Sequence, residues 1–405
     1  MSSMLSRLTP YGLSFLSSLC IMVLELVASK LVARHVGASL DVWTSVIGIM
    51  LGGICLGNVL GGRLADRYEP RSAIGPLYAL GALMTISTLW MNAFVGMTPG
   101  LENLNWDLRT LVVVALDFLI PGTVLGMISP VVAKIAVEQT TRAGGAIGNI
   151  YFWGAVGSIV GTFLAGFYLM YYATTTAIVA IVAAGLAVLS ALMMNGLGRL
   201  FALVTAALLA GGAFARTGSM QIGAMLFDHL VIAGTVSSVV LGVLGLAALG
   251  KARYPREAME ADEAFGSGML DDARASGRSR LYDLAALAFI ASLAFMAFEM
   301  VAGRLVTRHL GSSIYGWTSV IGVLLAGLSL GNFLGGKIAD RVKTETQASW
   351  LFLAASIFTL CVLLMEAPPK WLVSNPIAYA KGADPEPLLG TTGSYLSEAI
   401  TMRGY

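Results

Sequence analysis

The sequence has little charge and few of the residues that build soluble sites. Only 12% of its 405 residues are charged, 57% are hydrophobic, and it has three cysteines and three histidines. A soluble domain carries about a quarter charged residues, so a soluble enzyme, a secreted disulfide scaffold and a disordered protein are excluded. The net charge of +2 gives no indication of a nucleic-acid partner. The class that remains is a polytopic, all-α integral membrane protein whose main partner is the lipid bilayer.

Long apolar runs define the expected membrane spans. A spanning helix needs about 20 mostly apolar residues, and eleven stretches of the sequence meet this requirement. They lie near 11–34, 42–64, 73–95, 109–133, 149–172, 173–195, 199–215, 223–249, 281–306, 314–336 and 348–366. The seventh of these stretches is the shortest.

The distribution of lysine and arginine predicts a cytoplasmic N terminus. With that orientation, 16 of the 25 basic residues lie in inner loops, where such residues are enriched, and six lie on the outer side. We expect a bacterial plasma-membrane protein. Eleven spans would leave residues 367–405, a Pro-rich tail, outside the cytoplasm.

The strongest signal is an internal repeat. Residues 25–67 align with residues 299–341 at a constant offset of 274, and 26 of the 43 positions are identical. The matches include Trp, Asn, Asp, Arg and His, which general hydrophobicity cannot explain. Eight spans precede the second copy, so both copies enter the membrane in the same direction, as in transporters built from parallel repeats.

Glycines recur at every fourth position in the second helix of each copy. The first glycine face consists of Gly53, Gly57 and Gly61, and the second glycine face consists of Gly327, Gly331 and Gly335. Small residues at this spacing let a neighbouring helix approach closely. We expect both faces to pack against helices, and a surface on which two halves slide is the alternative.

The inner loop after this helix carries a recognisable motif. It reads Gly-Arg-Leu-Ala-Asp-Arg at 62–67 and Gly-Lys-Ile-Ala-Asp-Arg at 336–341. This resembles the G-x-L-A-D-R loop of major facilitator superfamily transporters, where charges at the inner face hold the two halves in one state. The resemblance gives that role to Asp66, Arg67, Asp340 and Arg341. Ordinary inner-loop charge is the alternative.

A narrower resemblance involves the first helix of each copy. Residues 25–31 read Glu-Leu-Val-Ala-Ser-Lys-Leu and residues 299–305 read Glu-Met-Val-Ala-Gly-Arg-Leu. Both are similar to the first helix of fused transporter-like/spermidine synthase membrane proteins, and residues 148–167 resemble the fifth helix of that family. The resemblance covers 11–195 and 281–366, and it implies a transporter-like fold.

The enzymatic part of that family has no counterpart here. The glycine run at 144–148 precedes a membrane helix instead of following a strand, so it is not a cofactor loop. We expect no cofactor, no metal site and no aminopropyltransferase activity. The chain is expected to be the membrane part of such a protein, truncated or encoded apart from its enzyme.

Five segments follow from these patterns. They are a first repeat of six helices (1–195), two additional membrane helices (196–250), a charged cytoplasmic linker (251–280), an incomplete second repeat of three helices (281–366) and the tail (367–405).

Three acidic residues fall inside the expected spans, where an ionisable group costs about 2.5–3.5 kcal/mol on insertion scales. Glu25 and Glu299 are equivalent under the repeat, and Asp117 lies in a helix interrupted by Pro121 and Pro130. Broken helices often line transporter sites. These acids are the candidates for a substrate or proton path. The alternatives are structural neutralisation of each glutamate by a nearby base or by nearby Asn and Ser groups, and simple bending of the helix that carries Asp117.

The resulting functional hypothesis is a transporter-like module that moves a small organic cation, such as a polyamine. The alternative is a non-transporting membrane anchor or subunit that docks a soluble aminopropyltransferase domain or a larger membrane complex.

Overall fold

The computed structural model describes residues 2–37, 39–140, 143–217, 221–253, 286–306, 314–339, 350 and 353–361. Contacts divide the chain into two compact units, Met1–Lys337 and Ile338–Tyr405. The described residues are helical apart from short connections, and they contain no strand beyond an isolated antiparallel bridge between Tyr68 and Arg253. The fold that positions the candidate site belongs to the first unit.

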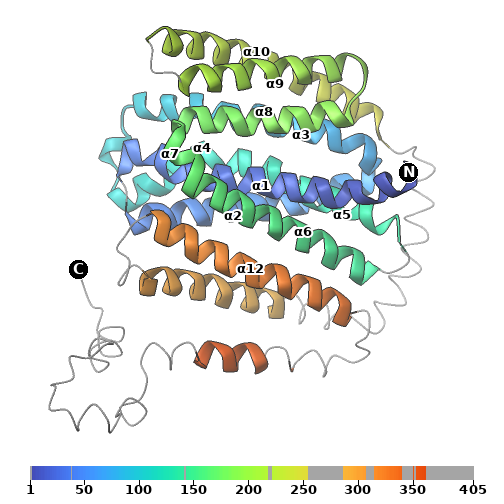
Figure 1. Ribbon diagram of the computed structural model, residues 1–405. Helices are drawn as coiled ribbons and strands as arrows, with labels where there is room; N and C mark the ends of the chain where they lie inside the picture. Colours follow the sequence, from blue (N-terminus) through green and yellow to red (C-terminus); the bar gives the residue numbers. More distant parts are fainter. Residues whose placement is uncertain are drawn as a thin grey trace, which may run out of the picture. The chain divides into compact units, whose positions relative to one another are not determined.

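From α1 to α10 the helices follow one another closely along the chain (Figure 1). In chain order they are α1 (Ser2–Val36), α2 (Leu40–Arg67), α3 (Pro70–Met97), η1 (Leu101–Asn103), α4 (Trp106–Gly126), α5 (Ile128–Val137), α6 (Ala143–Phe163), the π-helix η2 (Leu164–Leu169), α7 (Met170–Tyr172), α8 (Thr175–Met193), α9 (Gly196–Thr217), α10 (Gln221–Lys251), the helix Ala286–Val306, and α12 (Ile314–Ala339).

Within the described residues, ten helices are long and apolar enough to cross a membrane. They confirm the first ten predicted spans, including the short seventh one, which is the helix Gly196–Arg216. In the last predicted span, 348–366, residues 353–361 are helical and most of the remainder lies outside the described residues. Nearly all of the linker 251–280 and the whole tail 367–405 also lie outside them, so the predicted segment boundaries stay predictions.

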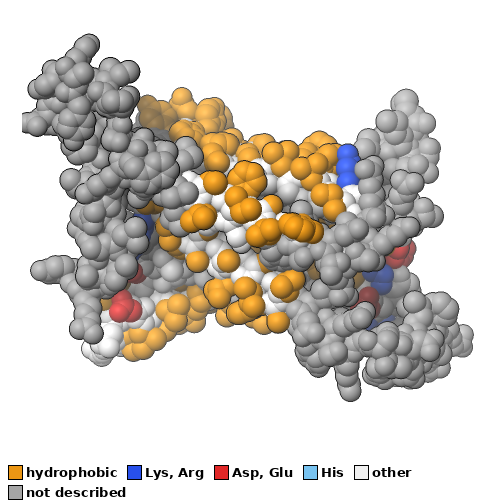
Figure 2. Space-filling model, turned by 90° about the horizontal axis from the view of Figure 1, so that it is seen from below, with side chains coloured by type: hydrophobic (Ala, Val, Ile, Leu, Met, Phe, Trp, Pro, Cys, Tyr) orange, Lys and Arg blue, Asp and Glu red, His pale blue; other side chains and the backbone are white. Residues whose placement is uncertain are grey.

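Packing in the first unit centres on α1. This helix contacts α6, α8, α5 and α2, and α2 packs against α4 while α3 packs against α8 and α10. The hairpin of α9 and α10 runs along one side of these helices, as Figure 1 shows. Hydrophobic side chains cover the middle of the face drawn in Figure 2, and charged side chains lie toward its two ends. This distribution suits a protein surrounded by lipid.

The fourth predicted span is broken, as its prolines suggested. α4 ends at Gly126 and α5 begins at Ile128, although the stretch Trp106–Val137 is long and apolar enough to form one membrane span. Pro130 lies in the first turn of α5 and has no amide hydrogen to donate to the carbonyl four residues earlier. Pro121 lies inside α4 without ending it. The break therefore falls beside the second proline.

Candidate site: membrane acids and helix contacts

The structure brings Glu25 and Glu299 together. Glu25 lies on α1 between the buried residues Leu24 and Leu26, and Glu299 lies on the helix Ala286–Val306 with 8% of its surface exposed. The two carboxyl groups are close enough for the charge of Glu299 to act on Glu25. Two positions 274 residues apart in the sequence therefore supply one acidic site inside the membrane spans.

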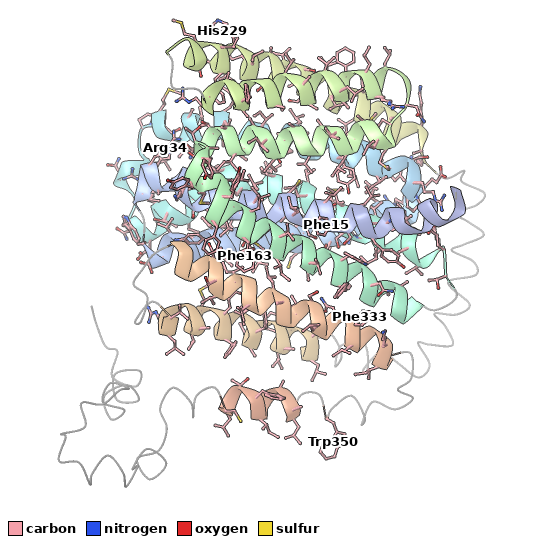
Figure 3. The ribbon with its side chains drawn as sticks, in the orientation of Figure 1. Phe15, Arg34, Phe163, His229, Phe333 and Trp350 are labelled. Carbon is pink, nitrogen blue, oxygen red and sulfur yellow. The ribbon has the colours of Figure 1, made fainter. Side chains whose placement is uncertain are left out.

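No described base forms an ion pair with either glutamate. Lys30 follows Glu25 by five residues and is exposed, and Arg304 follows Glu299 by the same interval and is also exposed. Arg34, labelled in Figure 3, donates from Nη2 to Thr175 Oγ1 at 3.2 Å. The ion pair present among the described residues joins Asp66 to Lys134.

Asp117 belongs to a separate polar cluster formed by α1, α3 and α4. Asn92 Nδ2 donates to Asp117 Oδ2 at 2.8 Å, and the Asn92 side-chain carbonyl lies 3.2 Å from His35 Nε2, whose N–H it accepts. Asp117 is 1% exposed, and its Oδ1 has no described hydrogen-bond partner. Sequence reasoning found Asp117 but not Asn92. The signal that could have identified Asn92 is its polar amide side chain inside the long apolar run that forms α3.

The C-terminal end of α2 carries a charge contact with a residue that the sequence motif did not include. Lys134 of α5 lies with its Nζ 3.2 Å from Asp66 Oδ1, and it also donates to the Ala65 carbonyl at 2.7 Å. Arg67 is exposed. Asp340 and Arg341, the predicted partners in the second copy, lie outside the described residues. The described part of the network is thus a contact within the first repeat, between α2 and α5.

The first glycine face (Gly53, Gly57 and Gly61) packs directly against the backbone of the broken span. A Cβ built on Gly53 would lie 2.9 Å from the Leu119 carbonyl oxygen. One on Gly57 would collide with the Thr123 carbonyl, and one on Gly61 would lie 2.5 Å from the Met127 carbonyl. No side chain fits at these positions, so α2 and α4 touch backbone to backbone.

The second glycine face (Gly327, Gly331 and Gly335) has a different environment. A Cβ on any of these three glycines would meet no described atom within 4 Å. Among the described residues, another helix therefore packs on the glycine face in the first copy, as predicted, and none does so in the second copy.

α12 instead packs on α6 and η2 through another of its faces, which we call the α6-contact face. The contacts run along the whole helix, and Figure 3 labels Phe163 at one of them and Phe333 at another. Gly336 lies against Gly148, the rings of Phe333 and Phe152 are 5.2 Å apart, Ser329 Oγ donates to the Phe152 carbonyl at 3.3 Å, Gly322 lies against Phe163, and Thr318 lies against Gly166.

The π-helix η2 lies where Thr318 meets Gly166. Single-turn π segments inside α-helices occur frequently at functional sites. The sequence reading did not foresee this segment, because no residue pattern specifies a π turn.

Glycines of α6, within the stretch 148–167 that resembles the fifth helix of the family, contact α1. A Cβ on Gly157 would collide with the carbonyl of Phe15, and one on Gly161 would lie 2.7 Å from the carbonyl of Leu19. Ser14 Oγ donates to the Ile150 carbonyl at 2.9 Å across the same contact. These glycines hold α6 against the helix that carries Glu25.

Comparisons with protein-family models, with curated proteins and with solved structures found no match. The function is therefore inferred from the sequence and geometry of this chain. In the described part of the chain, no three His, Cys, Asp or Glu side chains are grouped closely enough to bind a metal ion.

Proposed function

We propose that this protein is a transporter-like membrane protein built from two related halves, and that Glu25 and Glu299 together bind a small organic cation such as a polyamine. The observation that carries the proposal is the proximity of two repeat-equivalent carboxyl groups inside the membrane spans, neither of which forms an ion pair with a described base. Two acids in one low-dielectric site repel each other when both are charged. A cation between them relieves that repulsion and offsets their desolvation.

A polyamine suits such a pair better than a metal ion does. It carries several ammonium groups on a flexible apolar chain, so two carboxylates on different helices can each accept from one end. An intramembrane acid is by default a functional-site hypothesis because its insertion is unfavourable. The proposed relationship to major facilitator transporters and to fused spermidine synthases rests on the repeat and its motifs.

The test is uptake of radiolabelled putrescine and spermidine into proteoliposomes that contain the purified chain. We expect Glu25→Gln and Glu299→Gln each to reduce uptake by about tenfold or more, since a hydrogen bond to a charged group contributes about 1.5–3 kcal/mol. Glu138→Gln is the matched control, because Glu138 is exposed at the end of α5 and should leave uptake unchanged.

A chain that takes up neither amine, or two variants that behave like the control, would contradict the proposal. The first of these outcomes, with a normally folded chain, would favour the non-transporting anchor or subunit. The specific observation in favour of that alternative is the open second glycine face of α12, which is available to a partner.

A further inference from the structure

The second glycine face of α12 has small residues spaced for close packing of another helix, but no described helix lies against it. A Cβ on Gly327, Gly331 or Gly335 would meet no described atom within 4 Å. Flanking side chains are exposed as well, with Val323 at 69% and Leu330 at 59%. The face is therefore open over about three turns of α12 among the described residues.

The same residues hold a helix in the first copy of the repeat. There the glycines of α2 meet the α4 backbone, and the fit is reciprocal because a Cβ on Gly126 of α4 would lie 2.7 Å from the Ile54 Cα. Gly122 lies one turn earlier on α4, where a Cβ would be 3.6 Å from the Gly53 Cα. On the α4 side the contact therefore requires glycine at position 126, whereas a Cβ at position 122 would make ordinary van der Waals contacts.

We propose that the second glycine face is the docking site of a transmembrane helix of a partner protein, one that presents small residues four positions apart, as α4 does with Gly122 and Gly126. Identical glycines at identical spacing select the same kind of helix, because only a partner with small residues lets the two backbones approach. This proposal is independent of whether the protein transports anything.

Two other candidate occupants of the second glycine face agree less well with the packing seen in the first copy. In a second molecule of this chain, the small-residue face of α4 already packs against α2 and is not available. A contact between the second glycine faces of two molecules is tested below by energy transfer between labelled copies of the chain. The span predicted at 348–366 corresponds, at the offset of 274, to residues 74–92 of α3. The atoms nearest to the first glycine face come from α4, Met127 and α5, and none comes from α3.

The experiment uses a synthetic peptide of residues 104–138, which spans α4 and α5, as the probe. The full chain carries a donor fluorophore at its N terminus, the peptide carries an acceptor, and energy transfer is measured in proteoliposomes as the peptide fraction rises. We expect saturable transfer that unlabelled peptide competes away. Gly331→Leu in the chain should raise the peptide fraction for half saturation by about tenfold or more, because leucine overpacks the contact.

Gly62→Leu is the matched control in the chain. Gly62 lies on α2 with no described atom near its Cβ position, so the same substitution there should change half saturation by less than about twofold. Gly126→Leu in the peptide tests the same contact from the other side without altering the chain, and it should also weaken transfer.

Four results would overturn the proposal. The first is transfer no greater than random mixing in the bilayer gives, and the second is transfer that Gly331→Leu and Gly126→Leu leave unchanged. The third is Gly331-dependent transfer between donor- and acceptor-labelled copies of the full chain, which would assign the face to a second copy. The fourth is a larger loss of thermal stability in Gly331→Leu than in Gly62→Leu without peptide, which would mean that the chain itself fills the face.

Discussion

The helices α2 and α12 carry nearly the same sequence but pack through different faces. α2 uses its glycine face, which lies against α4, and α12 uses its α6-contact face, which lies against α6 and η2. On α2, three positions equivalent to the α6-contact face are open: a Cβ on Gly48 or Gly62 would meet no described atom within 4 Å, and Val59 is 55% exposed. A fourth, Thr44, donates instead to Met300 Sδ at 3.9 Å. Each copy thus shows the contact that the other lacks among the described residues.

This difference shows that a small-residue face permits a contact without creating one. In a bilayer, lipid tails solvate leucine and glycine faces alike, so two helices gain little from apolar burial itself. The gain comes from close van der Waals contact with a complementary neighbour. A repeated sequence can therefore have one occupied and one open copy of the same face.

The largest expected difference between α2 and α12 concerns the middle glycine of each glycine face. Gly57→Leu should destabilise the protein by on the order of 3 kcal/mol or more, because the new side chain collides with the α4 backbone and α4 must move. Gly331→Leu, the equivalent change in α12, should alter stability by less than about 0.5 kcal/mol. Thermal unfolding of both variants in the same detergent measures the difference. Equal destabilisation would show that both faces are packed.

The next effect concerns the polar cluster of His35, Asn92 and Asp117. Asn92→Ala should cost about 1–3 kcal/mol, because it leaves Asp117 Oδ2 buried without its hydrogen-bond donor. Asn58→Ala on α2 is the matched control, since Asn58 is exposed and should change stability by less than about 0.5 kcal/mol. Denaturation in mixed micelles compares the two. A neutral Asn92→Ala would mean that Asp117 finds another partner.

The smallest effect compares one repeat position whose residue differs between the copies. Ser329 of α12 is 3% exposed and donates to the Phe152 carbonyl, whereas its equivalent on α2, Cys55, is exposed. Ser329→Ala should therefore cost about 0.5–1.5 kcal/mol, the net contribution of one neutral hydrogen bond. Cys55→Ala should be neutral in the same unfolding assay. A neutral result at Ser329 as well would mean that the α6-contact face is held by shape alone.

Local sequence properties were sufficient to predict the helices. Apolar runs of spanning length predicted ten helices that the structure contains, because in a membrane each backbone amide must be satisfied within its own helix. The same reasoning placed the break in the fourth span, since Pro130 lacks an amide hydrogen wherever it lies. The repeat also identified both glycine faces before any neighbour was known.

Only the tertiary structure decided which residues meet. Glu25 and Glu299, His35 and Asn92, and Asp66 and Lys134 are separated by 274, 57 and 68 residues, and no local pattern states that they are neighbours. The tertiary structure also decided which of the two glycine faces has a described helix packed against it. A sequence determines what a helix face can accept, because side-chain size and hydrogen-bonding capacity are local properties. Which helix lies against that face depends on how all the helices pack together.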